Sequence, residues 1–138
     1  MNEINEYADE MIRTYGVNVY KAVHESKLRG DVLIFFMKNP FHMTISQVSR
    51  SMRVDYSNIK RVIKGGGGHY AKDRALIFLG LLNYEESNGE ETYSINFQGF
   101  NAAVILEKER ESKSSDQSDQ PVKNTAFKER NAGSNRNK

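Results

Sequence analysis

Thr44 to Lys64 reads Thr-Ile-Ser-Gln-Val-Ser-Arg-Ser-Met-Arg-Val-Asp-Tyr-Ser-Asn-Ile-Lys-Arg-Val-Ile-Lys, and this segment carries the strongest structural signal in the chain. Its first four residues form a capping box, in which a threonine hydroxyl and a glutamine side chain each accept from a backbone N–H at a helix start. Apolar residues follow at helical spacing as far as Met52. Asp55 is a suitable N-cap for a further helix. The segment predicts two helices joined by a short turn.

The second of these helices, residues 55–64, has two chemically different sides. At 100° per residue, one side holds the apolar residues Ile59, Val62 and Ile63. The opposite side and its flanks carry hydroxyl, amide and cationic groups, from Ser57, Asn58, Lys60, Arg61 and Lys64. We therefore expect the aliphatic side to be buried and the cationic side to face solvent.

Charge is distributed unevenly along the chain. The 138 residues have a net charge of +2, yet residues 27–83 hold ten basic and three acidic side chains. Residues 84–111 hold two basic and seven acidic side chains. The first region has the electrostatic character of a polyanion-binding surface if its cations share one face. The alternative is a solvated surface whose charges happen to cluster.

Three helices are expected before this segment, over residues 3–15, 17–24 and 27–38. The centre of the third, Val32 to Met37, is apolar on every side, which predicts that other helices surround it. Asn39-Pro40 ends this helix, because proline disfavours the helical conformation in the residue before it.

After Lys64, four glycines cannot form a stable helix interior. A short apolar helix is expected over residues 74–79, with Asp73 as its N-cap and Gly80 as its stop signal. Asn88-Gly89 then predicts a β-hairpin with a two-residue type I′ turn.

The hairpin turn fixes the expected strand pairing. Ser87 faces Glu90, Glu86 faces Glu91, Glu85 faces Thr92, Tyr84 faces Tyr93 and Leu82 faces Ile95. A final helix is expected over residues 98–111. Residues 112–138 are predicted to be a disordered tail, because they contain too few apolar side chains to offset the entropy of ordering.

The order of helix, capped helix, turn, cationic helix, apolar helix and hairpin over residues 26–97 is similar to that of the winged helix-turn-helix family. We therefore expect a mostly α fold with a small β-hairpin, with extra N- and C-terminal helices at residues 1–25 and 98–111. Two features depart from the family pattern. Arg53 occupies a turn position where many relatives have glycine, and the Gly65 to Lys72 insertion splits what is usually one continuous element.

The resemblance implies sequence-specific binding of double-stranded DNA by a transcriptional regulator, with the recognition helix 55–64 in the major groove. Arg61 would bind guanine, Asn58 would bind adenine, and Lys64 would contact a phosphate. Many relatives bind pseudo-palindromes as dimers, and the apolar stripes of residues 4–23 and 100–106 are candidate homodimer interfaces. Each stripe is equally suited to packing on its own domain. The candidate DNA-binding residues are Thr44, Tyr56, Ser57, Asn58, Lys60, Arg61, Lys64, Gly66, His69, Tyr70 and Lys72.

The glycine segment, Gly65 to Gly68, has two explanations. It lacks the Gly-Lys-Ser/Thr ending of a nucleotide-binding P-loop. Its backbone N–H groups, flanked by Lys64 and Lys72, are suited to clamp a DNA phosphate. A flexible spacer between two elements is the alternative.

The predicted hairpin argues partly against DNA contact, because Glu85, Glu86, Glu90 and Glu91 lie near its tip. A phosphate backbone would repel these side chains. The hairpin either points away from DNA or contacts a cationic partner. The competing function is therefore a protein–protein interaction module that uses the acidic hairpin as its binding surface.

Catalysis has no support in the sequence. The absence of cysteine excludes disulfides and thiolate metal sites, and His24, His42 and His69 share no ligand spacing. No hydrolase, metalloprotease or dinucleotide-binding motif occurs. We expect neither enzyme activity nor a cofactor. Without a membrane-spanning run or an apolar leader, the expected location is the cytoplasm.

Overall fold

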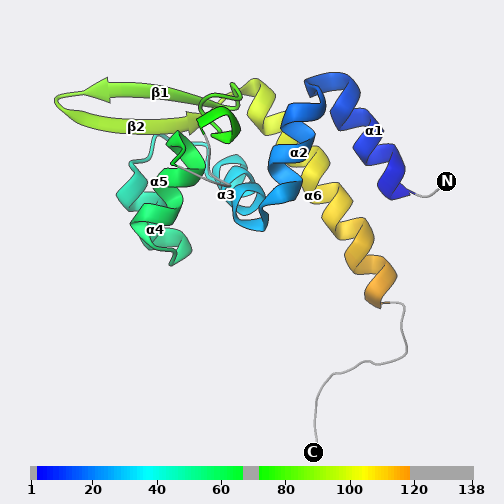
Figure 1. Cartoon of the computed structure of the whole chain (residues 1–138). Helices are drawn as coiled ribbons and strands as arrows, with labels where there is room; N and C mark the ends of the chain where they lie inside the picture. Colours follow the sequence, from blue (N-terminus) through cyan, green and yellow to red (C-terminus); the bar gives the residue numbers. More distant parts are fainter. Residues whose placement is uncertain (1–2, 67–71, 119–138) are drawn as a thin grey trace, which may run out of the picture.

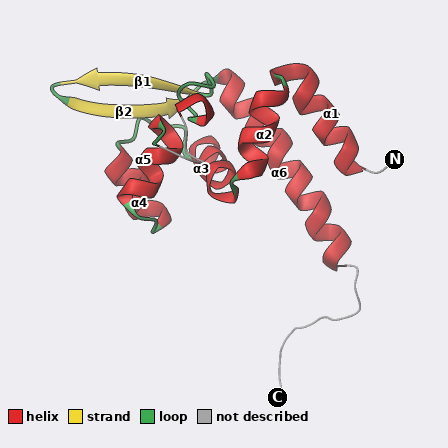
Figure 2. Ribbon diagram, in the orientation of Figure 1, coloured by secondary structure: helices red, strands yellow, loops and turns green. Residues whose placement is uncertain are grey.

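The computed structural model of the chain describes residues 3–66 and 72–118. Over these residues the fold is mostly helical with one two-stranded antiparallel hairpin, as expected (Figures 1 and 2). The elements in chain order are α1 (Glu3–Tyr15), α2 (Val17–Glu25), α3 (Lys27–Lys38), α4 (Ile45–Met52), α5 (Tyr56–Lys64), the 3-10 helix η2 (Lys72–Arg74), β1 (Leu82–Ser87), β2 (Glu90–Ile95) and α6 (Phe97–Ser118).

Helix α3 is the centre of the core, which confirms the prediction from its apolar sequence. Val32, Leu33 and Phe36 are fully buried. Helix α6 packs closely along α3 at Gly30, where a Cβ atom would lie 2.9 Å from the Leu106 side chain. The two helices approach this closely because glycine has no side chain.

Helices α1 and α2 pack against the same core, with α1 beside α6 and α2 beside α3 (Figure 1). Met11, Val19 and Val23 are buried there. Most of the apolar stripe of residues 4–23 therefore covers its own domain. Helix α2 is also tied to α6 by His24, whose Nε2 lies 2.7 Å from Oε1 of Glu109.

The hairpin has the strand pairing expected from its turn, from Leu82 opposite Ile95 to Ser87 opposite Glu90. Asn88 and Gly89 both have positive φ, of 55° and 79°, as a type I′ turn requires. Met43 joins the other edge of β2 through two backbone hydrogen bonds with Tyr93, of 2.9 and 2.8 Å. This bridge attaches the hairpin to the chain just before α4.

The capping box at the start of α4 is confirmed. The backbone N–H of Gln47 donates to the Thr44 hydroxyl at 3.1 Å, and the backbone N–H of Thr44 donates to the Gln47 side chain at 2.8 Å. The turn after α4 places Arg53 in the left-handed region, with φ 61° and ψ 45°. The Ser49 hydroxyl donates to the Val54 carbonyl and so closes this turn.

Asp55 occupies the N-cap position of α5, but its side chain makes no capping hydrogen bond. The prediction of a capping aspartate is therefore right about position and wrong about the interaction. The helix start relies on backbone bonds instead, because the N–H groups of Asn58 and Ile59 both donate to the Asp55 carbonyl.

Residues 74–79 do not form the expected helix. After η2 the chain runs through consecutive turns, with Asp73 inside η2. The cause is a long-range contact, because Leu76 and Ile77 donate their backbone N–H groups to the carbonyls of Val62 and Ile63 at the end of α5. These bonds are 3.1 and 3.2 Å long, and they satisfy carbonyls that a helix end leaves unpaired.

Helix α6 continues to Ser118, beyond the predicted end at residue 111. Glycine and proline, the strongest helix breakers, do not occur between residues 112 and 118, so nothing local stops the helix there. The rest of the predicted tail, residues 119–138, lies outside the described residues.

Candidate nucleic-acid interface

The outward side of α5 is the main feature of this interface. Ile59, Val62 and Ile63 are fully buried, so the opposite side of the helix is free to face solvent. The exposed residues are those expected from helical spacing, namely Tyr56, Ser57, Lys60, Arg61 and Lys64. Asn58 is half-buried on the flank. The orientation on which the DNA-binding prediction depends is therefore confirmed.

Two of the candidate base-reading side chains contact each other. An Arg61 guanidinium N–H donates to the Asn58 side-chain oxygen, with a distance of 3.3 Å between the heavy atoms. This hydrogen bond is exposed and joins residues three positions apart on the helix, so its exchange for a bond to a base edge costs little free energy. The pair holds Arg61 close to the helix surface in the free chain.

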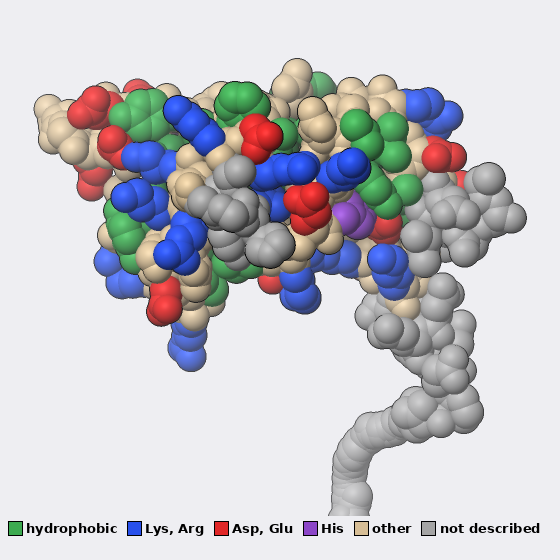
Figure 3. All heavy atoms as spheres, in the orientation of Figure 1, with side chains coloured by type: hydrophobic (Ala, Val, Ile, Leu, Met, Phe, Trp, Pro, Cys, Tyr) green, Lys and Arg blue, Asp and Glu red, His purple; other side chains and the backbone are tan. Residues whose placement is uncertain are grey.

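Two further exposed arginines belong to the same basic region, Arg50 on α4 and Arg53 in the turn. Figure 3 shows Lys and Arg side chains over the α4 and α5 end of the molecule and Asp and Glu side chains at the hairpin tip. Neither arginine was among the candidate residues. The helical spacing of α4 predicts Arg50, because it lies opposite the buried residues Ile45 and Val48.

The acidic hairpin does not point away from α5. The Lys64 ammonium lies 3.3 Å from Oε1 of Glu91 on β2. At its other strand, Glu85 lies 3.4 Å from the ring of His42. The Glu91 carboxylate therefore pairs with a cation of α5 in its own chain. Contact of the hairpin with a cationic partner, and its direction relative to DNA, stay predictions.

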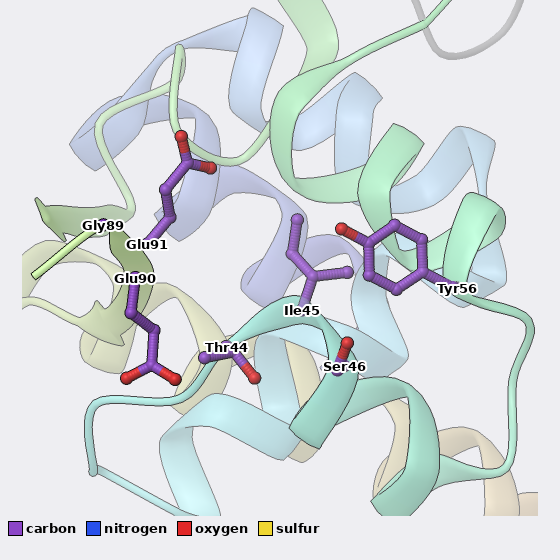
Figure 4. Close-up of a pocket in the computed structure, with 7 residues that line it drawn as sticks. All are labelled: Thr44, Ile45, Ser46, Tyr56, Gly89, Glu90 and Glu91. Carbon is purple, nitrogen blue, oxygen red and sulfur yellow. The ribbon is translucent and has the colours of Figure 1, made fainter.

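A pocket of about 300 Å³ lies where the starts of α4 and α5 meet the hairpin tip (Figure 4). It is lined by Thr44, Ile45, Ser46, Tyr56, Gly89, Glu90 and Glu91. In Figure 4 the side chains of Glu90 and Glu91 leave the strand in opposite directions. The Thr44 hydroxyl accepts the capping hydrogen bond and retains its own proton for a further acceptor.

Tyrosines surround Glu91 on the inner side of the hairpin. The Tyr84 hydroxyl donates to Oε2 of Glu91 at 3.3 Å, and the rings of Tyr84 and Tyr93 lie 5.5 Å apart. Burial raises the pKa of Tyr93 to about 12, with the negative charge of Glu91 as the next cause. Both carboxylate oxygens of Glu91 are therefore engaged, one by a hydroxyl and one by a cation.

Only part of the glycine segment is described. Gly66 follows the end of α5, where a Cβ atom would lie 2.9 Å from Cγ of Arg61, so the backbone passes close to this side chain. Lys72 is exposed in η2. His69 and Tyr70 lie outside the described residues, and the phosphate clamp stays a hypothesis.

Over residues 3–66 and 72–118, no group of three or more His, Cys, Asp or Glu side chains could hold a metal ion. In the same residues, no helix has the length and apolar character needed to cross a membrane. His24 is a packing residue, because both of its ring nitrogens bond oxygen atoms of its own chain.

Comparison with known proteins places the chain in a family. It is 32% identical over 89 residues to an uncharacterized protein of Methanocaldococcus jannaschii, an alignment that covers 64% of this chain and 80% of the relative. No solved structure matches. Residues 19–106, which run from α2 through the hairpin into α6, match the EarA-like family. The chain belongs to the EarA-like family.

Proposed function

We propose that this chain binds double-stranded DNA in a sequence-specific way, as a winged helix-turn-helix transcriptional regulator inside the cell. The observation that carries the proposal is the outward side of α5, on which Ser57, Lys60, Arg61 and Lys64 are exposed while the aliphatic side is buried. No acidic residue follows Asp55 in this helix.

The arrangement of the surrounding elements supports this assignment. Helices α4 and α5 are joined by a three-residue turn, and the hairpin follows them and is attached through Met43. Helix α5 has nine residues, so at 1.5 Å per residue it is roughly 13 Å long. The major groove of B-DNA, about 12 Å wide, admits an α-helix of this kind.

Each exposed residue of α5 has a proposed role. Arg61 exchanges its bond with Asn58 for two bonds to guanine, and Asn58 is then free to read an adenine. Tyr56 and Ser57, in the first turn, lie near base edges, since recognition helices contact bases through their N-terminal residues. Lys60 approaches the base edges beside Arg61, and Lys64 contacts a phosphate.

The binding is tested by fluorescence anisotropy with a labelled random-sequence duplex over a range of salt concentrations. We expect salt-sensitive binding, with a slope of log affinity against log salt that falls by about 0.9 in Lys64→Ala, because one phosphate contact is lost. Lys108→Ala is the matched control, because Lys108 is an exposed lysine on α6. Absence of binding at low salt, or an equal effect of both variants, would contradict the proposal.

We propose in addition that the regulator acts as a homodimer. Most of the apolar stripe of residues 4–23 is buried by packing within the chain. In the second stripe, Ala102, Ala103 and Leu106 are buried as well. The start of α6 retains exposed apolar surface at Phe97 and Phe100. Light scattering measures the mass of the wild type and of Phe97→Ser. A wild-type mass equal to that of a monomer would contradict the proposed dimer.

The second candidate function is a protein–protein interaction module that uses the acidic hairpin. Glu86 and Glu90 favour it, because both are exposed and neither has an ion-pair partner within the described part of the chain. It predicts that the random duplex does not bind even at low salt, which distinguishes it from the first proposal.

A further inference from the structure

We propose that the hairpin residue Glu91 is a built-in competitor of DNA phosphate for Lys64, and that it restrains the affinity of the chain for DNA. This inference rests on the proposed function and names a residue outside α5 that controls it. The contact that carries it is the ion pair between Lys64 Nζ and Glu91 Oε1, 3.3 Å apart.

Lys64 lies where a phosphate that approaches α5 would contact it. It is the last residue of α5, on the same outward side as Ser57 and Arg61. Immediately beyond it, Gly65 ends the helix with a φ of 93° and donates its N–H to the Arg61 carbonyl. A phosphate that approaches the C-terminal part of α5 meets this lysine with a carboxylate already bound to it.

Glu91 is held in place by its own strand. Its second carboxylate oxygen, Oε2, accepts a hydrogen bond from the Tyr84 hydroxyl at 3.3 Å, across the hairpin. Glu86 lies directly opposite Glu91 in the strand register, and their like charges favour a cation beside them. The carboxylate is therefore stabilised where it meets Lys64 and does not depend on the lysine alone for its position.

The exposure of the pair sets the size of the effect. The side chains of Lys64 and Glu91 are 39% and 44% exposed. Exposed ion pairs are weak, so DNA can displace Glu91, yet the displacement lowers affinity by between about 1.4-fold and fivefold. The restraint weakens as salt increases, because salt screens exposed charges. It is a graded control of binding and does not block it.

The test is a double-mutant cycle in the full-length chain, with affinity for a labelled random-sequence duplex as the measurement. Glu91→Gln should bind between about 1.4-fold and fivefold more tightly than wild type at low salt. Glu91→Gln should give no such gain in a Lys64→Ala background, because no pair remains to be released. Glu90→Gln is the matched control: it removes the same charge from the adjacent residue, whose side chain leaves the strand in the other direction (Figure 4).

The outcomes are distinct. A gain in duplex affinity that is confined to Glu91→Gln and disappears in the Lys64→Ala background supports competition between Glu91 and phosphate for Lys64. An equal gain in Glu90→Gln, a gain that persists without Lys64, or no gain at all overturns it and leaves DNA binding itself intact. If neither the wild type nor any variant binds duplex at low salt, the proposed function fails and the inference fails with it.

Discussion

Replacing His24 by alanine should destabilise the fold more than replacing its partner Glu109 by leucine. Both ring nitrogens of His24 face oxygen atoms, with Nδ1 2.7 Å from the Tyr20 carbonyl and Nε2 2.7 Å from Glu109. The two side chains differ in exposure, at 23% for His24 and 3% for Glu109.

The unequal exposure gives the two variants unequal costs. His24→Ala leaves the buried carboxyl group of Glu109 without its hydrogen-bond partner, and a buried group left unsatisfied in this way costs about 3 kcal/mol in the free energy of unfolding. Glu109→Leu leaves a partly exposed imidazole that keeps its hydrogen bond to the Tyr20 carbonyl, so the cost is at most about 1.5 kcal/mol. The added apolar side chain beside Leu106 offsets part of that cost.

Urea unfolding followed by circular dichroism at constant pH measures both free energies. His42→Ala is the matched control, because it removes a histidine whose pair with Glu85 is 3.4 Å long and mostly exposed. The control should cost less than about 1 kcal/mol. Equal costs of Glu109→Leu and His24→Ala, or a cost of His24→Ala no larger than that of the control, would contradict the expected order.

Three further predictions concern backbone geometry and burial. Gly99→Ala should lower the free energy of unfolding by at least about 1–3 kcal/mol, because the new Cβ atom would lie 2.0 Å from the buried Leu81 carbonyl oxygen; a thermal midpoint equal to that of wild type would contradict the clash. Arg53→Gly should stabilise the chain by about 1 kcal/mol in urea, because it relieves a left-handed arginine, and should weaken duplex binding through the lost cation; unchanged stability would contradict it. Burial raises the pKa of Tyr93 to about 12, from its usual value of 10. The free energy of unfolding therefore keeps this contribution in full below pH 10 and falls by about 3 kcal/mol as the pH rises to 12 and beyond. Tyr93→Phe should remove this part of the alkaline loss of stability, and a pH profile of stability equal to that of the wild type would contradict it.

Local signals predicted much of the fold because they act over a few residues. The capping box at Thr44 and the turn at Asn88 fixed a helix start and a strand register, and both are observed. Helical spacing predicted the exposed side of α5 for the same reason. These patterns concern one element at a time, so their outcome does not depend on distant partners.

Long-range contacts explain what the sequence did not predict. Residues 74–79 have a helical pattern, but their backbone bonds go to the end of α5, which no local pattern reveals. The register of the hairpin placed Glu91 opposite Glu86, yet it carried no information on the direction of the hairpin relative to Lys64. The apolar stripe of residues 4–23 was equally consistent with a partner or its own domain, and only the packing of α1 and α2 distinguishes them.

The two backbone bonds from Leu76 and Ile77 to the end of α5 have a practical consequence for engineering. They join the end of α5 directly to the segment that leads into β1, so they help to set the placement of the hairpin relative to the helix. A proline at position 76 or 77 would remove one of these N–H donors, so a variant designed to keep the hairpin aligned with α5 should avoid proline at both positions.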